Sequence, residues 1–339
     1  MDYVTLGSTG ITVNKNGFGA LPIQRVSEKE AVFLLEKAYK NGITFYDTAR
    51  DYTDSEKKIG MTLSGKSEVR DKIFIATKTS AKTPGEFWEQ LETSLSMLKT
   101  ECIDIYQFHN PAFCPKPGDD SGLYDAIIEA KAQGKVKYIG LTNHRLEIAR
   151  EAAESGLYEV IQYPISYLSA PEELELVSLC DERNIGFIAM KALSGGLITN
   201  SAAAYAFFMQ IANAIPIWGI QREHELDEFL SYQETTPTLD ENALREIARD
   251  AEELSGDFCR GCGYCLPCPA KIHIPTAARM SVLMKRAHES LYLSELARDS
   301  MKRVDDCINC GHCMEHCPYG LDAPRLMRES LVDFRKLIN

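Results

Sequence analysis

The segment IFIATK at Ile73–Lys78 is a short, almost uninterrupted apolar run that ends in a lysine, and IDIYQF at Ile103–Phe108 repeats this pattern. Such runs are typical of strands in a parallel sheet, because helices cover both faces of that sheet. An amphipathic helical pattern, Glu86–Lys99, separates the two runs. Together they predict a strand–helix–strand unit with parallel strands.

The same unit repeats along most of the chain, with helical patterns such as Glu28–Asn41 and Leu123–Gln133 between the apolar runs. Six further runs are predicted as buried strands: Gly17–Ala20, Ile43–Thr48, Val136–Thr142, Val160–Pro164, Gly186–Lys191 and Ile215–Ile220. Eight strands that alternate with helices over roughly 230 residues predict an α/β fold of the (β/α)8 TIM barrel type. A doubly wound open sheet is the alternative, but eight similar units leave no place for the strand order to reverse. The segment Leu6–Val13, with a turn at Ser8–Gly10, predicts a hairpin before the first barrel strand.

A second, smaller domain is predicted after the barrel. The polar tract Ser231–Thr238 contains Pro237 and has the composition of a linker. A helix is expected over Asp240–Leu254, with Asp240 as its N-cap, and mostly helical sequence follows at Ile274–Arg303. We therefore expect a barrel over residues 1–237 and a small α-helical domain over residues 238–339.

The composition narrows the class of protein. The chain has 339 residues, a net charge of −12, 45% hydrophobic residues and 25% charged residues, as in ordinary globular proteins. The acidic balance argues against nucleic-acid binding, which needs clustered lysine and arginine. The amino-terminal sequence lacks a signal-peptide pattern, and polar residues and Pro216 interrupt the longest apolar stretch, Ala202–Ile220. We expect a cytoplasmic protein without a membrane span.

Eight of the 11 cysteines fall between Cys259 and Cys317. In a reducing compartment, clustered cysteines are better explained by metal binding than by disulfides. The first run is C-x2-C-x2-C-x2-C-P, and its cysteines are Cys259, Cys262, Cys265 and Cys268. The second run is C-x2-C-x2-C-x3-C-P, and its cysteines are Cys307, Cys310, Cys313 and Cys317. The second run matches the bacterial iron–sulfur pattern, whereas zinc, the alternative, favours paired C-x2–4-C motifs with a long spacer.

In two-cluster ferredoxins the fourth cysteine of each run binds the other cluster. This rule predicts two 4Fe-4S clusters with crossed ligand sets. One set is Cys259, Cys262, Cys265 and Cys317, and the other is Cys307, Cys310, Cys313 and Cys268. The helical sequence between the runs resembles the helical type of dicluster ferredoxin.

Polar side chains stand at the ends of the predicted barrel strands, where barrel enzymes build their active sites. Asp47, Lys78 and His109 end three successive strands, and Tyr52 follows Asp47 by five residues. Tyrosine, with an ordinary pKa of about 10, is a weak acid, but a neighbouring ammonium favours the phenolate. We expect Tyr52 to protonate a developing alkoxide with the support of Lys78 and Asp47, while His109 polarises the carbonyl. The alternative is that Asp47 and Lys78 form only a structural ion pair.

Three motifs, Phe45–Tyr52 (FYDTARDY), Ile75–Lys78 (IATK) and Ile103–His109 (IDIYQFH), resemble the tetrad motifs of the aldo/keto reductases. The LGSTG sequence near the amino terminus, Gly134–Asn143, Gln162 and Gly219 also match that family in order, so the resemblance covers about residues 1–230. It implies a barrel oxidoreductase that transfers hydride between NADP(H) or NAD(H) and a small-molecule carbonyl or alcohol. The spacing in the cysteine runs also resembles the iron–sulfur members of this family.

The resemblance also implies a nucleotide site. Thr142, Asn143 and Gln162 would hold the nicotinamide carboxamide, and Met190 stands where many members carry a stacking aromatic residue. The residues implied near the pyrophosphate or adenine are Leu193, Gly195, Gly219, Gln221 and Arg222. Ala192 replaces a usual proline, and only Arg222 remains of the basic residues that usually bind a 2′-phosphate.

The leading hypothesis is therefore an aldo/keto reductase-type enzyme with a fused electron-transfer domain and a redox partner protein. Nicotinamide moves two electrons as hydride, whereas each cluster moves one, and no flavin-binding pattern is visible to convert between them. Two alternatives stay open. One is an electron-transfer or redox-sensing protein whose barrel does not turn over nicotinamide, and the other is a cluster-driven reductase that uses the tetrad without NAD(P)H.

Overall fold

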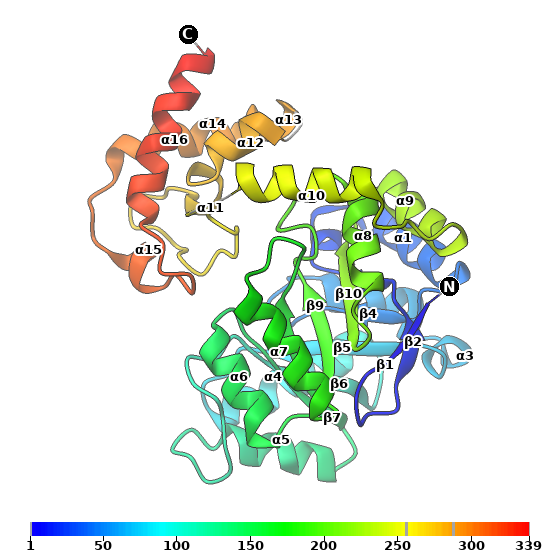
Figure 1. Cartoon of the computed structure of the whole chain (residues 1–339). Helices are drawn as coiled ribbons and strands as arrows, with labels where there is room; N and C mark the ends of the chain where they lie inside the picture. Colours follow the sequence, from blue (N-terminus) through cyan, green and yellow to red (C-terminus); the bar gives the residue numbers. More distant parts are fainter. Residues whose placement is uncertain (1, 255–256, 287–288, 339) are drawn as a thin grey trace. The chain divides into compact units, whose positions relative to one another are not determined.

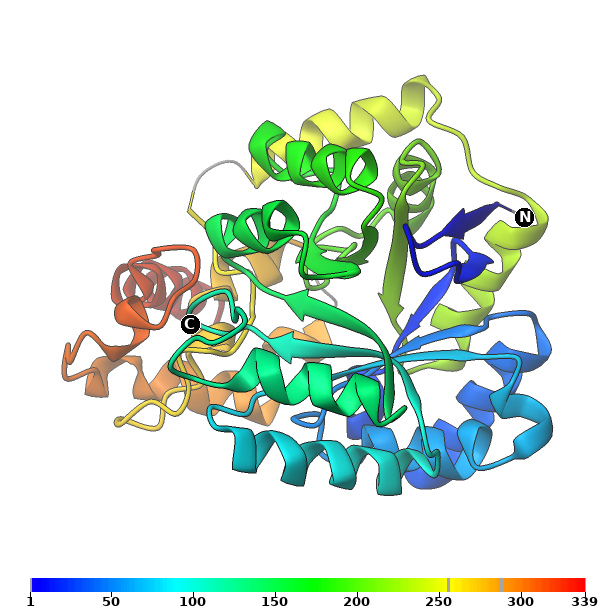
Figure 2. The same cartoon turned by 90° about the horizontal axis from the view of Figure 1, so that it is seen from below.

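Eight parallel strands form a closed barrel in the computed structural model, which describes residues 2–254, 257–286 and 289–338 (Figures 1 and 2). Each strand pairs with the next along the chain, and the last pairs with the first. The strands are β3 (Gly17–Gly19), β4 (Phe45–Asp47), β5 (Phe74–Thr79), β6 (Ile103–His109), β7 (Val136–Thr142), β8 (Val160–Pro164), β9 (Gly186–Met190) and β10 (Ala214–Gly219). The closed order confirms the predicted barrel and excludes the open sheet.

Helices surround the strands, as the view from below shows (Figure 2). They are α1 (Glu28–Lys40), α2 (Ser55–Ile59), α3 (Ser67–Arg70), α4 (Pro84–Leu98), α5 (Leu123–Ala132), α6 (Leu146–Ser155), α7 (Pro171–Glu182), α8 (Ser201–Met209) and α9 (Glu223–Glu234). A capping box begins α1, because Ser27 Oγ accepts from Glu30 N while the Glu30 carboxylate accepts from Ser27 N.

The predicted linker at Ser231–Thr238 is wrong in its first half, because α9 continues to Glu234. One face of α9 is buried although its last turn has a polar composition. Phe229 stacks on Trp218 at a centroid distance of 4.3 Å, and Gln233, one turn further along, is also buried. Packing of this face against β10 therefore keeps the polar residues helical.

A hairpin precedes the first barrel strand, as predicted, and consists of β1 (Tyr3–Thr5) paired antiparallel with β2 (Thr12–Asn14). Its strands lie further out than the predicted Leu6–Val13, because β1 ends before Leu6. Its apolar side chains join those at the amino-terminal ends of barrel strands in one buried cluster that includes Val4, Leu6, Ile11 and Val13 together with Phe45, Val160 and Ile215. Because the hairpin covers this end of the barrel core, the opposite, carboxyl ends of the strands are left to form a site at the mouth of the barrel.

The chain forms two compact units. The first contains residues 1–192 and 201–243, and the second contains residues 193–200 and 244–339. The segment Leu193–Asn200 connects β9 with α8, yet it belongs with the carboxyl-terminal unit. The expected domain boundary between residues 237 and 238 stays a prediction.

The second unit is helical, as expected. Its helices are α10 (Glu241–Glu253), α11 (Ile274–Ala277), α12 (Met280–Arg286), α13 (Glu289–Tyr292), α14 (Glu295–Lys302), α15 (His312–Glu315) and α16 (Ala323–Ile338). Asp240 caps α10, since its Oδ1 accepts from Ala243 N at 2.8 Å. Residues 287 and 288 of the predicted helical stretch lie outside the described residues. Met327 and Phe334 of α16 pack in a core with Met280 and Met301. None of the described helices is long and apolar enough to cross a membrane.

Candidate functional site

A buried ion pair joins the ends of two neighbouring strands. Lys78 Nζ on β5 lies 2.7 Å from Asp47 Oδ1 on β4 and donates to Thr48 O at 2.6 Å. Loss of water raises the pKa of the Asp47 carboxyl and lowers that of Lys78, while their mutual attraction opposes both shifts. Because desolvation of such a pair offsets much of its attraction, stability alone is a weak reason for its presence.

Tyr52 lies in the loop after β4, half-buried, with its ring centroid 5.3 Å from Lys78 Nζ. Its carbonyl accepts from Ser55 N at 2.8 Å, at the start of α2. Ser55 Oγ donates to Ala20 O and accepts from Thr48 Oγ1, both at 2.9 Å. The loop that carries Tyr52 is therefore fixed to the ends of β3 and β4.

His109 is the last residue of β6, and its ring meets that of Tyr52 edge-on at a centroid distance of 5.9 Å. His109 Nδ1 lies 3.3 Å from Asp51 Oδ2, and Asp51 Oδ1 accepts from Ser80 Oγ at 3.0 Å. The interaction with His109 holds the pKa of the Asp51 carboxyl below its ordinary value. Sequence reasoning missed Asp51, although its place directly before Tyr52 was a signal that a carboxylate lies in this loop.

The structure thus brings the four predicted catalytic residues together. Asp47, Lys78 and His109 come from the adjacent strands β4, β5 and β6, and Tyr52 reaches the same end from a loop. Asp47 and Lys78 are almost completely buried, whereas Tyr52 is partly exposed. A purely structural ion pair would account for Asp47 and Lys78, but not for the aromatic pair beside them.

The residues predicted to hold the nicotinamide lie at the ends of the next three strands. Thr142 on β7 pairs in register with Gln162 on β8, and Asn143 N donates to Gln162 O at 3.1 Å. Met190 ends β9, where its Sδ lies 3.9 Å from Thr142 Oγ1. The Gln162 side chain also favours the charged form of Asp47, so this set adjoins the tetrad.

The remaining predicted nucleotide residues fall into two sets in different units. Gly219, Gln221 and Arg222 lead from β10 into α9 in the first unit, whereas Leu193 and Gly195 belong to the second. The structure therefore does not assemble these five residues within one unit.

A carboxylate occupies the amino terminus of α9. The N–H groups of Gln221 and Arg222 both donate to Glu225 Oε2 at 2.9 Å. A helix amino terminus is otherwise a ready site for a phosphate. Sequence reasoning missed this contact, because it depends on the turn of the helix that brings Glu225 back to Gln221 and Arg222.

The eight clustered cysteines line two cavities in the second unit. One cavity is lined by Cys259, Cys262, Cys265, Cys313 and Cys317. The other is lined by Cys268, Cys307, Cys310 and Cys313. Ile274 borders both cavities. Cys317 of the second run thus lines a cavity with the first three cysteines of the first run, and Cys268 lines one with the first three of the second run, while Cys313 lines both. The crossed ligand sets stay a prediction.

The donor chemistry of these cavities fits an iron–sulfur cluster. Burial raises the pKa of the Cys265 thiol to about 12, so a thiolate there needs positive charge nearby, which iron provides. Gly261 N donates to Cys259 Sγ at 3.4 Å, and Leu321 N donates to Cys317 Sγ at 3.5 Å; such bonds tune clusters. Among the described residues no three His, Cys, Asp or Glu side chains converge on a single ion. Cubane ligands each bind a different iron atom and therefore stand further apart.

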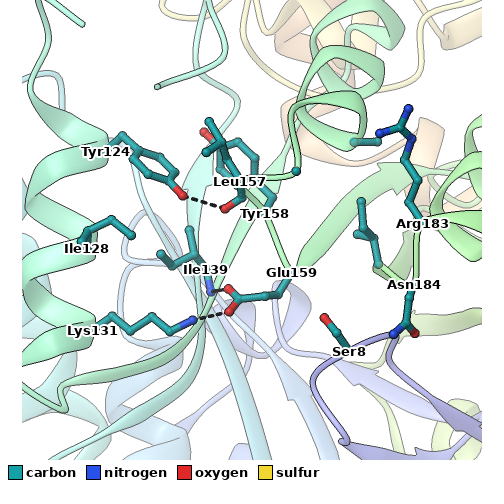
Figure 3. Close-up of a pocket in the computed structure, with 13 residues that line it drawn as sticks. Ser8, Tyr124, Ile128, Lys131, Ile139, Leu157, Tyr158, Glu159, Arg183 and Asn184 are labelled. Carbon is teal, nitrogen blue, oxygen red and sulfur yellow. Dashed lines mark hydrogen bonds and ion pairs between the residues drawn. The ribbon is translucent and has the colours of Figure 1, made fainter. Parts of the chain in front are cut away.

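A separate pocket lies at the amino-terminal ends of β8 and β9 (Figure 3). Lys131 and the backbone N–H of Ile139 both donate to the carboxylate of Glu159, which precedes β8. No tetrad residue lines this pocket, and it occupies the opposite end of the strands from Asp47 and Lys78.

Comparison with known proteins agrees with this geometry. The model of the aldo/keto reductase family matches residues 15–203, which is more than half of the chain. The chain belongs to the aldo/keto reductase family. A 4Fe-4S dicluster domain matches residues 258–321, which include both cysteine runs.

Individual relatives are distant. A probable aldo-keto reductase 1 of Glycine max is 30% identical over 209 residues, covering 57% of this chain and 60% of the relative. L-galactose dehydrogenase of Arabidopsis thaliana is 29% identical over 210 residues, and the match spans 66% of its length. These two matches span less than two thirds of either relative.

Two further matches cover more of the barrel. The NADH-specific methylglyoxal reductase of Escherichia coli is 26% identical over 294 residues, covering 75% of this chain and 88% of the relative. The solved structure of an aldo-keto reductase from Bacillus halodurans superposes with a TM-score of 0.63 at 21% identity. It covers 74% of this chain and 96% of that chain, and it shows the shared fold.

The Lys78–Asp47 pair generates a stability prediction. Lys78→Met leaves the Asp47 carboxylate buried and unpaired, so the free energy of unfolding should fall by about 3–5 kcal/mol. This loss should shrink as the pH falls, because protonation of Asp47 removes the unpaired charge. Urea unfolding, followed by the fluorescence of Trp88 and Trp218 in the barrel unit, measures both effects.

The double variant Asp47→Asn/Lys78→Met is the control, because it carries neither charge and should recover much of the lost stability. A Lys78→Met variant as stable as the wild type at neutral pH would contradict the buried pair.

Proposed function

We propose that the protein is an NAD(P)H-linked oxidoreductase that interconverts a small carbonyl compound and its alcohol, with two 4Fe-4S clusters in its carboxyl-terminal unit. The observation that carries this proposal is the buried Lys78–Asp47 pair beside the Tyr52 and His109 rings. A bound nicotinamide supplies or accepts the hydride at the substrate carbon. Thr142, Asn143 and Gln162 are proposed to hold its carboxamide.

Tyr52 is the proposed general acid. Its phenol donates a proton to the substrate oxygen as negative charge develops there, and in the reverse direction the phenolate takes the proton back. Lys78 Nζ, 5.3 Å from the ring centroid, stabilises the phenolate. Asp47 and the Thr48 carbonyl hold this ammonium in place, so its charge does not need to reorganise during the reaction.

His109 is proposed to orient and polarise the substrate oxygen. Asp51 faces Nδ1, so Nε2 is the ring nitrogen left to meet the substrate. In the proposed arrangement Nε2 faces the substrate oxygen while Nδ1 lies 3.3 Å from the Asp51 carboxylate. Asp51 is thus a positioning residue for His109.

The cysteine cavities are proposed to hold the clusters in the crossed sets of four. A 4Fe-4S cluster supplies one-electron transfer. Because hydride transfer moves two electrons, we propose that a partner protein exchanges single electrons with this unit. Cys310 is exposed, in contrast to Cys265. We therefore propose that the partner protein exchanges electrons with the cluster in the cavity that Cys310 lines.

A second candidate is a redox-sensing protein whose barrel does not turn over nicotinamide. The observation that favours it is Glu225, whose carboxylate occupies N–H groups that would otherwise serve a nucleotide phosphate. Fluorescence titration with NADH and NADPH separates the two candidates, since only the enzyme requires submillimolar affinity for one of them.

Tyr52→Phe should reduce turnover by about 10²–10⁴-fold, because it removes the proton donor and leaves the ring in place. Nucleotide affinity should stay close to that of the wild type. The measurement is NAD(P)H oxidation at saturating concentrations of small aldehydes and ketones, with Tyr3→Phe at an exposed tyrosine as the matched control. Unchanged turnover in Tyr52→Phe would show that another group donates the proton.

Glu225→Ala should improve binding of NADPH relative to NADH by about tenfold, or about 1.4 kcal/mol. The substitution frees the N–H groups of Gln221 and Arg222 and removes a negative charge beside the proposed 2′-phosphate position. Isothermal titration with both nucleotides measures the ratio. Glu223→Ala is the matched control, because Glu223 lies on the same turn of α9 as Glu225 but pairs with Lys37 of α1. Equal ratios in the two variants would contradict the assignment.

The crossed ligand sets predict the effects of removing one cysteine. Reconstituted wild-type protein should bind about eight irons per chain, and Cys268→Ser and Cys317→Ser should each retain about four. The surviving cluster should be a different one in each variant, which EPR spectra of the reduced proteins distinguish. Cys180→Ser, at a buried cysteine outside both runs, is the control. Identical spectra from the Cys268 and Cys317 variants would contradict the crossed sets.

A further inference from the structure

Arg279 connects the first cysteine run to the segment Leu193–Asn200 within the second unit. Its Nη2 donates to Gly195 O at 2.7 Å. Its Nη1 packs against Gly261 so closely that a Cβ at Gly261 would lie 2.4 Å from it. Gly261 stands between Cys259 and Cys262, and its N–H donates to Cys259 Sγ. One guanidinium therefore contacts both a predicted cluster loop and a predicted nucleotide loop.

The charge of Arg279 is not balanced by a carboxylate. No Asp or Glu of the described residues forms an ion pair with it, and its Nε is buried without a hydrogen-bond partner. Partial burial lowers the pKa of the Arg279 guanidinium, and the ionisable group that opposes this shift is the Cys259 side chain. A partly desolvated cation is stabilised by an anion close to it, and the first cysteine run, which the guanidinium contacts at Gly261, is where such an anion would be bound.

We propose that Arg279 is the countercharge of the cluster bound by Cys259, Cys262, Cys265 and Cys317, and that it links the reduction of this cluster to nucleotide binding at the segment Leu193–Asn200. The linkage rests on the proposed function for both the ligand set and the nucleotide position at Leu193 and Gly195.

The electron balance fixes the direction of the first effect. One electron from dithionite converts the 2+ cluster core to 1+, with no bond broken and no proton taken up, and adds one negative charge. A nearby guanidinium stabilises that charge. Replacing Arg279 by an uncharged residue therefore lowers the midpoint potential of this cluster. The potential of the other cluster, bound by Cys268, Cys307, Cys310 and Cys313, should not change and serves as an internal reference.

The shape of the segment gives the direction of the second effect. Ser194, Gly195 and Gly196 all have positive φ angles, so the segment takes an unusual path that the Arg279 contact helps to hold. A nucleotide pyrophosphate and an added electron both draw on the same positive charge. The reduced protein therefore binds nucleotide more weakly. Because the coupling free energy is reciprocal, bound nucleotide also lowers the midpoint potential of the cluster by the equivalent amount. A tenfold difference in affinity corresponds to about 59 mV for a one-electron couple.

The first experiment is an EPR-monitored redox titration of the reconstituted full chain, after iron content has been measured. Arg279→Gln should lower the potential of one cluster only, while Arg279→Lys keeps the charge and stays close to the wild type. Arg303→Gln, at an exposed arginine that pairs with Asp299, is the control and should change neither potential. Unchanged potentials in an iron-replete Arg279→Gln variant overturn the countercharge.

The second experiment measures the affinity for ADP-ribose, which carries the pyrophosphate but no nicotinamide, in the oxidised and the dithionite-reduced protein. The wild type should bind it about tenfold more tightly when oxidised. Arg279→Gln should bring this ratio close to one. If Arg279→Gln loses iron, Arg279→Lys is tested in its place. A single ammonium cannot contact both Gly261 and Gly195, so the ratio of oxidised to reduced affinity should fall in Arg279→Lys as well.

The outcomes separate the two proposals. Equal ADP-ribose affinities in the two redox states of the wild type overturn the linkage but not the nicotinamide site. No binding in either state overturns the nucleotide site of the proposed function and the linkage with it. The cluster potentials still decide, independently, whether Arg279 is the countercharge.

Discussion

The ion pair between Lys78 and Asp47 is the constraint on which the candidate active site depends. Two charges 2.7 Å apart with almost no exposure to water have to be held by a rigid frame, because any displacement leaves each charge desolvated and unpaired. The adjacent strands β4 and β5 provide this frame, and the hairpin closes the barrel on the other side. The result is a fixed positive charge beside a partly exposed phenol, which is the arrangement that proton transfer to a substrate oxygen requires.

A second layer of buried polar contacts holds the aromatic residues in reach of that charge. Glu56, at the start of α2, accepts from Thr77 Oγ1 at 2.6 Å and pairs with Arg50, so the turn that carries Tyr52 is tied to β5. Asp51 restrains the imidazole of His109 from the same turn. The segment between β4 and α2 therefore supports both rings through the polar side chains of Asp51 and Glu56.

Much of this arrangement was predictable because it depends on local pattern. Apolar runs identify strands in a barrel that is covered on both faces, and the end of each run places Asp47, Lys78 and His109 on one edge. The cysteine spacing likewise predicts that thiols of the two runs meet, as Cys317 does with the first run and Cys268 with the second. The contacts of Asp51, Glu225 and Arg279 were not predictable, because each joins residues whose proximity only the folded chain decides. The linker predicted from Ser231 was wrong for a related reason. Burial of Phe229 against Trp218 keeps α9 helical to Glu234 despite its polar, linker-like composition.

Lys78 and Arg279 differ in how their positive charge is balanced. Lys78 is paired with Asp47 inside the barrel, so the balance of its charge needs no cofactor. Arg279 has no carboxylate partner among the described residues and lies near the thiol of Cys259, whose pKa burial raises. In the proposed holoprotein, metal binding converts that thiol to a thiolate and adds the anionic cluster, which balances the charge of Arg279. Cluster assembly therefore contributes folding free energy to the second unit, and through Gly195 it also fixes the segment that follows β9.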